Sequence, residues 1–219
     1  MRFFVVLFLG IICAFPTMAE KPYRLMIFGD SLSAGYHLPQ KDAFYSKLQT
    51  ALNSNGYKNI VVIHQSKSGE TTTGGLKRLP QALSQYPDAV LLELGVNDAL
   101  RNEPIDTIRT NLQTMIDKFE RNKIPVMLIG MQIPTIKNPV YAQQFSTMYN
   151  TLAKKNSLIL YPFFMKGVLD YKSILQGKKL NYTQGDNLHP NATGVDIMVK
   201  NILPDIMSFL RKNGVKPTR

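Results

Sequence analysis

Cysteine is almost absent from this sequence. The single cysteine, Cys13, lies in the apolar segment at the start of the chain. Beyond residue 19 there is no thiol, and this excludes disulfide bonds and cysteine metal sites from that part of the protein. A lipoprotein signal would place a small residue before its cysteine, whereas Ile11 and Ile12 precede Cys13. We therefore expect no lipoprotein signal here.

The glycine-rich motifs of nucleotide-binding proteins are also missing. Neither Gly-x-Gly-x-x-Gly nor a Walker-type loop occurs, which argues against a flavin- or nucleotide-binding function. The chain has no internal repeat, no low-complexity segment and no linker. Residues 20–219 have the right length for one domain with a substantial core. We predict a single domain over this range.

Acidic residues are few: the chain has 15 of them against 26 basic residues, a formal net charge of +11. A basic surface favours anionic partners, and a contact with an anionic membrane surface is one interpretation. The basic residues are scattered and not interleaved with aromatic ones, so we predict no nucleic-acid partner.

The first 19 residues have the pattern of a signal peptide. Arg2 provides a positive start, residues 3–15 form an apolar run broken only by Gly10, and Thr17 and Ala19 are small residues suited to signal peptidase. This run is too short and too poorly flanked for a membrane span. We expect export, cleavage before Glu20, and a periplasmic or secreted protein.

Five apolar segments alternate with segments of helical periodicity. The predicted strands are 23–28, 59–64, 88–94, 124–129 and 158–161, and the predicted helices cover about 42–55, 73–86, 104–122, 140–155 and 191–212. Nearly continuous apolar strands are buried on both faces and pair in parallel. We therefore predict an α/β fold of three layers, αβα, with a five-stranded parallel sheet in the flavodoxin-like order 2-1-3-4-5.

One stretch, residues 24–36, carries a candidate nucleophile. Its apolar run stops at Gly29, and Asp30 and Ser31 precede small residues that can open a helix. Ser31 should therefore stand on a tight turn at the carboxyl edge of the sheet, where α/β proteins bind ligands. The alternative is that Asp30 and Ser31 only cap the next helix.

Three histidines are candidates for the base that a hydroxyl nucleophile needs. His37 follows the turn and suits a surface role, and His64 ends the second predicted strand. His189 is favoured because Asp186 lies three residues before it and Pro190 restrains its backbone. We also expect Pro190 to begin the last helix.

An oxyanion that forms during acyl transfer needs hydrogen-bond donors. The backbone N–H of Ser31 is one candidate. Gly69, where the missing Cβ allows close approach, and the side-chain amide of Asn97 are the others. Taken singly, Gly69 could be a turn residue and Asn97 part of an Asx turn, but both segments should meet Ser31 and His189 at one edge.

Four blocks together resemble the SGNH/GDSL hydrolase superfamily. They are Gly29-Asp30-Ser31-Leu32, the block around Gly69, Gly95-Val96-Asn97-Asp98, and Asp186-Asn187-Leu188-His189-Pro190. Residues 29–36, 74–80 and 162–165 further resemble the bacterial periplasmic acyl-CoA thioesterase I family, also described as lysophospholipase L1 and arylesterase. Lys67, Glu70 and Val96 depart from its usual residues.

The resemblance implies a serine hydrolase that acts on acyl esters and thioesters without a metal or cofactor. It implies Ser31 as nucleophile, His189 as base, Asp186 as orienting acid, and Ser31, Gly69 and Asn97 as the oxyanion hole. The alternatives are a carbohydrate acetylesterase of the same superfamily and a non-catalytic lipid-binding module.

The acyl chain is expected to contact the segment after the fourth strand. This segment contains Ile133 and Pro134, and its prolines and aliphatic residues suit the wall of an acyl pocket. Leu188, beside His189, is the third expected substrate contact.

Overall fold

The computed structural model describes residues 21–133 and 138–218. The elements of this part, in chain order, are β1 (Tyr23–Gly29), α1 (Ser31–Ala34), the 3-10 helix η1 (Gln40–Asp42), α2 (Phe44–Ser54), β2 (Ile60–Ser66), α3 (Thr72–Leu83), β3 (Ala89–Leu92), α4 (Val96–Leu100), α5 (Ile105–Arg121), β4 (Val126–Ile129), α6 (Pro139–Lys155), β5 (Ile159–Tyr161), α7 (Tyr171–Leu175) and α8 (Ala192–Lys212). The predicted signal peptide, 1–19, lies outside the described residues.

The sheet confirms the predicted class and order. Its five strands are arranged β2-β1-β3-β4-β5, and every neighbouring pair is parallel. β1 lies in the interior of the sheet, where Leu25 pairs with Ala89 on one side and Val62 on the other. All strands therefore end at the same edge of the sheet, and this edge receives the loops that carry the candidate residues.

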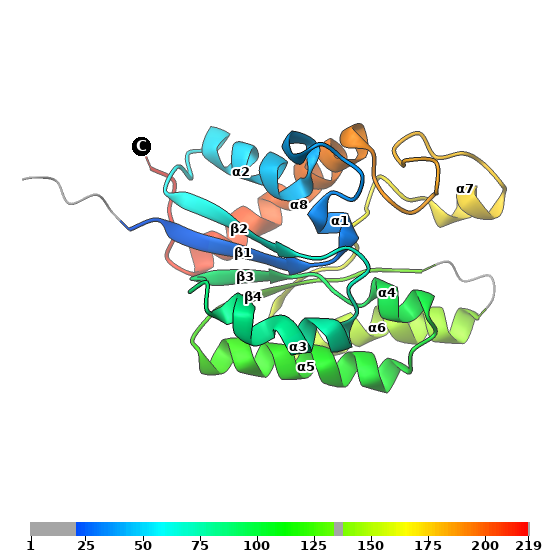
Figure 1. Ribbon diagram of the computed structural model, residues 1–219, viewed down its shortest axis with the longest axis horizontal. Helices are drawn as coiled ribbons and strands as arrows, with labels where there is room; N and C mark the ends of the chain where they lie inside the picture. The colour runs from blue at the N-terminus through cyan, green and yellow to red at the C-terminus, as the bar shows by residue number, and fades with distance from the viewer. Residues whose placement is uncertain (1–20, 134–137, 219) are drawn as a thin grey trace, which may run out of the picture.

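Helices cover both faces of the sheet (Figure 1). Helices α2 and α8 lie on one face, and α3, α5 and α6 lie on the other. The predicted apolar stripe of α5 is confirmed, because Leu112, Met115, Ile116 and Phe119 are all buried. The short helices α1, α4 and α7 lie at the carboxyl edge of the strands (Figure 1).

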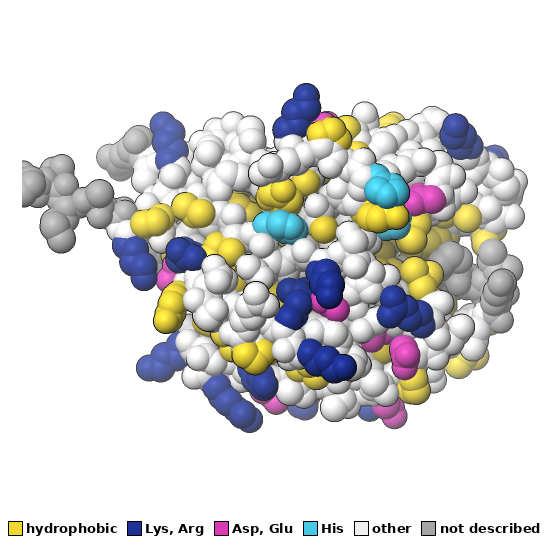
Figure 2. Space-filling model, viewed as in Figure 1, with side chains coloured by type: hydrophobic (Ala, Val, Ile, Leu, Met, Phe, Trp, Pro, Cys, Tyr) yellow, Lys and Arg dark blue, Asp and Glu magenta, His cyan; other side chains and the backbone are white. Residues whose placement is uncertain are grey.

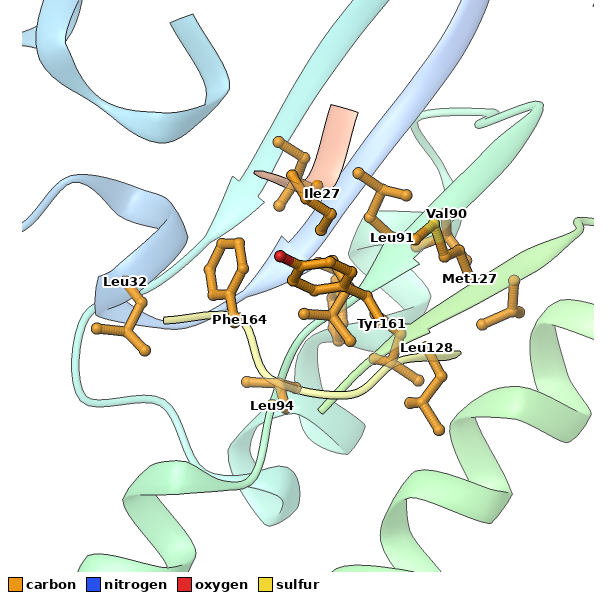
Figure 3. Packing of buried hydrophobic residues seen from close by; sticks show 14 of the residues in the cluster. Ile27, Leu32, Val90, Leu91, Leu94, Met127, Leu128, Tyr161 and Phe164 are labelled. Atoms are coloured by element: carbon orange, nitrogen blue, oxygen red, sulfur yellow. The ribbon is translucent and has the colours of Figure 1, made fainter. Parts of the chain in front are cut away.

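The core is formed by side chains from both faces of the strands. Figure 3 shows Ile27, Leu91 and Leu128, from three neighbouring strands, near Tyr161 and Phe164. The first three are fully buried, and burial of a side chain of this size contributes about 1.5–3 kcal/mol. The tightly packed sheet therefore fixes the positions at which the loops of its carboxyl edge begin.

The last helix begins later than we predicted. Pro190 is not its first residue, because Asn191 is the N-cap and the helix starts at Ala192. The Asn191 side chain accepts a hydrogen bond from the Gly194 N–H at 2.9 Å, which satisfies one of the free donors of the first turn. Pro190 instead pairs with Thr183 in an antiparallel bridge. The proposed base, His189, thus precedes a bridge and not a helix.

None of the helices in the described ranges has the length and apolar composition that a membrane crossing requires.

Candidate active site

Ser31 is the first residue of α1, directly after the carboxyl end of β1. Asp30 is the N-cap, and its side chain accepts a hydrogen bond from the Leu32 N–H at 2.9 Å. Gly35, with φ of +77°, ends the helix after one turn. The two interpretations of this stretch are therefore compatible: Asp30 caps a helix, and the same cap holds Ser31 on the strand-to-helix turn.

Ser31, His189 and Asp186 form one hydrogen-bonded chain. His189 Nε2 lies 2.9 Å from Ser31 Oγ, and His189 Nδ1 lies 2.6 Å from Asp186 Oδ2. The other carboxylate oxygen, Asp186 Oδ1, accepts the backbone N–H groups of Leu188 and His189, each at 2.9 Å. A carboxylate on Nδ1 leaves Nε2 free to accept a proton from the serine hydroxyl.

The loop keeps Asp186 charged. Burial acts to raise the pKa of Asp186, but the hydrogen bonds from the His189 side chain and from the two backbone N–H groups outweigh it, so the pKa is lowered. Asn187, in the middle of the loop, has a φ of +54°, a left-handed conformation that asparagine tolerates better than most residues. This conformation belongs to the tight loop in which the Asp186 carboxylate meets one ring nitrogen of His189 while the other ring nitrogen meets Ser31.

The other two histidines lie elsewhere. The His64 ring stacks on Tyr45, with 4.2 Å between centroids, and burial together with Arg78 lowers its pKa. His37 stacks on Tyr36 at 3.7 Å, and Tyr36 in turn lies 4.5 Å from the His189 ring. Figure 2 shows histidine side chains beside a hydrophobic and an acidic one on this surface. Among the described contacts of the three rings, only those of His189 include Ser31.

Gly69 lies in the loop between β2 and α3. Its φ is +75°, and a Cβ placed there would meet no atom within 4 Å. The positive φ favours glycine here, and the space beside the backbone is open; the role of Gly69 in the oxyanion hole stays a prediction. The Gly69 carbonyl accepts a hydrogen bond from Arg101 Nη2 at 3.1 Å, which ties the loop to the end of α4.

Asn97 lies in the short helix α4, where the sequence also allowed an Asx turn. Its Nδ2 donates to Asp30 Oδ2 at 3.2 Å, so the amide lies beside the Ser31 turn. The next residue, the buried Asp98, accepts hydrogen bonds from the backbone N–H of Thr72 at 2.8 Å and from its hydroxyl at 2.6 Å. Helix α4 is thus held between the nucleophile turn and the start of α3.

Arg78 connects three segments at this edge. Its Nε donates to Glu70 Oε2 at 2.6 Å, Nη1 to the Gln65 carbonyl at 2.9 Å, and Nη2 to the Gly29 carbonyl at 3.1 Å. Its guanidinium also lies 3.9 Å from the centre of the Phe28 ring. The sequence placed Arg78 only within a family-like segment and suggested no role for it.

The three departures from the thioesterase I pattern have different surroundings. Lys67 is exposed, whereas Glu70 and Val96 are buried. The Glu70 carboxylate is buried and paired with Arg78, so it stabilises the loop that contains Gly69 and does not face a substrate. Of the three, Lys67 alone is presented to solvent.

The predicted substrate contacts are only partly described. Leu188 is half-buried beside His189, Ile133 is half-buried and packs against the core, and Pro134 lies outside the described residues. A cavity of about 730 Å³ opens between α5 and α6, and its lining includes Ile105, Tyr141 and Met148. Neither Leu188 nor Ile133 lines it.

Two buried acids lie behind Ser31. Burial raises the pKa of Asp30 to about 7, although hydrogen bonds from Leu32 and Asn97 act against this rise. Burial and the neighbouring Asp30 raise the pKa of Glu93 well above its ordinary value. Sequence reasoning missed Glu93, although it is the one charged residue within the otherwise apolar run 89–94 and this was a usable signal. In the described ranges, no group of three or more His, Cys, Asp or Glu side chains could hold a metal ion.

Comparison with known proteins identifies the family. The model of the GDSL-like lipase/acylhydrolase family matches residues 27–197, and the chain belongs to this family. The chain is 38% identical over 168 residues to an arylesterase of Vibrio mimicus, a match that covers 76% of this chain and 80% of the relative. It is 36% identical over 186 residues to the thioesterase 1/protease 1/lysophospholipase L1 of Escherichia coli K12, which covers 82% and 83%.

A solved structure has the same fold. The psychrotrophic esterase EstA from Pseudoalteromonas sp., inhibited by monoethylphosphonate, matches with a TM-score of 0.77 and 32% identity. The match covers 86% of this chain and 98% of EstA. The resemblance expected from the four sequence blocks is therefore confirmed at the level of the family and of the fold.

Proposed function

We propose that this protein hydrolyses acyl esters and thioesters through an acyl-serine intermediate. The observation that carries the proposal is the unbroken chain from Ser31 Oγ through His189 to Asp186, with contacts of 2.9 Å and 2.6 Å. A neutral imidazole in this position can take the serine proton as the hydroxyl attacks a carbonyl carbon. The names of the relatives, arylesterase and thioesterase 1/protease 1/lysophospholipase L1, support the same reaction class.

The reaction has two stages. Ser31 attacks the carbonyl while His189 accepts its proton, and the negative charge on the carbonyl oxygen is stabilised by the Ser31 and Gly69 N–H groups and the Asn97 amide. The protonated His189 then donates to the leaving alcohol or thiol, and an acyl-serine remains. Water enters, gives a proton to His189 and releases the fatty acid, and Ser31 is regenerated.

The direct test is covalent labelling. A fluorophosphonate probe should label the protein, and Ser31→Ala should lose both the label and the hydrolysis of p-nitrophenyl esters. Ser84→Ala, an exposed serine at the end of α3, is the matched control and should be labelled fully. Persistent labelling or hydrolysis in Ser31→Ala would contradict the proposal and would favour a non-catalytic lipid-binding module.

The physiological substrates that we propose are lipid esters, because an exported enzyme would seldom meet acyl-CoA. A panel of lysophospholipids, p-nitrophenyl esters and acyl-CoAs of graded length, with Ser31→Ala as the blank, ranks these substrates. Acetylated carbohydrate belongs in the same panel. Preference for it over every acyl substrate would favour the carbohydrate acetylesterase instead.

The proposed location is the periplasm or the outside of the cell. It rests on the signal-peptide pattern of residues 1–19. Intact mass and N-terminal sequence of the protein recovered after expression with its full N-terminus should show a chain that begins at Glu20. A chain that retains Met1 and stays in the cytoplasm would contradict this location.

We further propose that the active edge contacts an anionic membrane. Five large hydrophobic side chains in loops, short helices and the first turn of α6 at this edge are exposed: Tyr36, Leu100, Val140, Leu175 and Tyr182. Exposed basic residues at the same edge are Lys67, Arg101, Lys172, Lys178 and Lys179. Apolar side chains that insert beside cations suit an anionic lipid surface.

Sedimentation with vesicles tests this contact. Binding should require phosphatidylglycerol in the phosphatidylcholine vesicles, weaken with salt, and fall in Leu100→Ser and Leu175→Ser. Tyr86→Ser changes an exposed side chain near the amino edge of the sheet and should bind normally. Equal binding by all the variants would contradict the contact.

A further inference from the structure

A pair of buried acids behind the nucleophile turn has no place in the reaction described above. Asp30 and Glu93 both have no exposed surface, and they come from the ends of β1 and β3. Burial of a carboxylate is costly unless its oxygens are hydrogen-bonded. The partners of each oxygen therefore indicate what the pair does.

Glu93 supports the turn as an acceptor. Its Oε2 accepts the Asp30 N–H at 3.2 Å and the Ser33 hydroxyl at 2.9 Å. Its Oε1 is buried and has no hydrogen-bond partner among the described residues. Both donors thus meet one oxygen of Glu93, and burial together with Asp30 raises the pKa of Glu93 well above its ordinary value.

The space for this carboxyl group exists because residue 29 is glycine. A Cβ on Gly29 would lie 2.5 Å from Glu93 Oε2 and 2.2 Å from Ser33 Oγ. The Ser33 hydroxyl is also 2.9 Å from that of Ser66 at the end of β2. Glu93, at the end of β3, therefore binds the backbone of Asp30, and through Ser33 it connects this turn to Ser66 at the end of β2.

Asp30 uses its two oxygens differently. Oδ1 accepts the Leu32 N–H at 2.9 Å and caps α1, whereas Oδ2 accepts the Asn97 amide at 3.2 Å. Capping explains only the first bond, because serine, threonine or asparagine would cap equally well without a buried charge. The second bond commits one N–H of the Asn97 amide, which sets the direction of the other N–H.

We propose that Asp30 is a positioning residue, whose carboxylate orients the Asn97 amide toward the oxyanion that forms on the substrate. This inference rests on the proposed hydrolase function and deepens it. A charge-assisted bond fixes the amide before the substrate arrives, so no reorientation is needed as charge develops. Asp98 and Glu70 are the other acids that act on Asp30, and both add negative potential around it.

A double-mutant cycle tests the inference on p-nitrophenyl ester hydrolysis. Asp30→Asn keeps the side-chain shape but replaces one carboxylate oxygen by an NH₂ group. That group faces either the Asn97 amide or the Leu32 N–H, so one of these two hydrogen bonds is lost. We expect kcat to fall about 10- to 100-fold, the equivalent of one charge-assisted hydrogen bond, with KM unchanged. Asn97→Ala should cost about 10²- to 10³-fold. Asp30→Asn added to Asn97→Ala should change kcat less than threefold further.

The controls separate positioning from folding. Asp88→Asn removes an acid near the amino edge of the sheet that accepts the Arg24 N–H, and it should leave kcat within twofold of the unchanged protein. Asp30→Ser keeps a capping hydroxyl but does not reach Asn97, and it replaces Asp30→Asn in the cycle if the latter does not fold.

The outcomes are distinct. If the losses from Asp30 and Asn97 multiply, or if KM rises in step with the fall in kcat, Asp30 does not act through Asn97 and the inference is overturned, while Ser31-dependent hydrolysis still stands. If Ser31→Ala hydrolyses the ester as fast as the unchanged protein, the proposed function fails and the inference fails with it.

Discussion

Removal of the Arg78 side chain should destabilise the protein more than any surface change of similar size. Arg78 donates to Glu70, Gln65 and Gly29 from one planar guanidinium group. The side chains of Arg78 and Glu70 are only 17% and 7% exposed, so solvent screens their interaction weakly. Arg78→Met keeps much of the apolar stem but leaves the Glu70 carboxylate buried without its cation.

The magnitude follows from the unpaired charge. Breaking a buried ion pair by removing one partner costs about 3–5 kcal/mol, because the remaining charge is no longer compensated. For a protein of this size each kcal/mol lowers the melting temperature by about 2–4 °C, so Arg78→Met should lower it by roughly 6–20 °C. Glu70→Gln combined with Arg78→Met should recover at least about 1 kcal/mol, because glutamine is neutral.

Urea unfolding of the purified variants, followed by circular dichroism, measures these free energies. Lys77→Met is the matched control, because it makes the same kind of change at an exposed neighbour, and it should stay within about 0.5 kcal/mol of the unchanged protein. A cost below about 1 kcal/mol for Arg78→Met would show that the pair behaves like a surface pair. A double variant no more stable than Arg78→Met would show that the Glu70 charge is not the cause.

Three further changes have definite expectations. Gly29→Ala places a Cβ 2.5 Å from Glu93 Oε2, so we expect a lower melting temperature and little ester hydrolysis; unchanged values for both would contradict the tight packing. Asp186→Asn should lower kcat on the order of 10⁴-fold, because the amide stabilises the wrong imidazole tautomer on His189. A loss of kcat below tenfold in timed assays of ester hydrolysis would refute this expectation. Tyr36→Ala removes a ring 4.5 Å from that of His189 and should lower kcat/KM about two- to tenfold, whereas Tyr36→Phe should match the unchanged protein in the same assay.

The fold was largely predictable because its signals are local. A strand such as 23–28 is apolar throughout, and the stripe of α5 repeats at helical spacing, so each element is recognisable from its own residues. The order of the strands followed from the alternation of strand and helix. The helix start at Ala192 was missed because the prediction used only the preference of proline for a first turn and overlooked Asn191, a favourable N-cap residue that accepts the Gly194 N–H.

The candidate site was predictable where residues stand at informative positions along the chain. Ser31 after an apolar strand, and Asp186 three residues before His189, indicated acid–base chemistry before any contact was known. Glu93 was not recognised, since its partners are distant in sequence, and Arg78 was not, since its acceptors lie on three separate segments. Arg78 contacts a carbonyl 49 residues away, and Glu93 contacts Asp30, 63 residues away.

The sequence alone determined where strands and helices lie, and which polar residues stand at the ends of the strands, because both depend on short-range periodicity and backbone preference. Only the tertiary structure decided that the Ser31 hydroxyl meets a ring 158 residues away. It also decided which acids are buried deeply enough for their pKa values to be raised. The physical reason is that hydrogen-bond distance and desolvation depend on the packing of elements that are distant along the chain, and no local pattern records that packing.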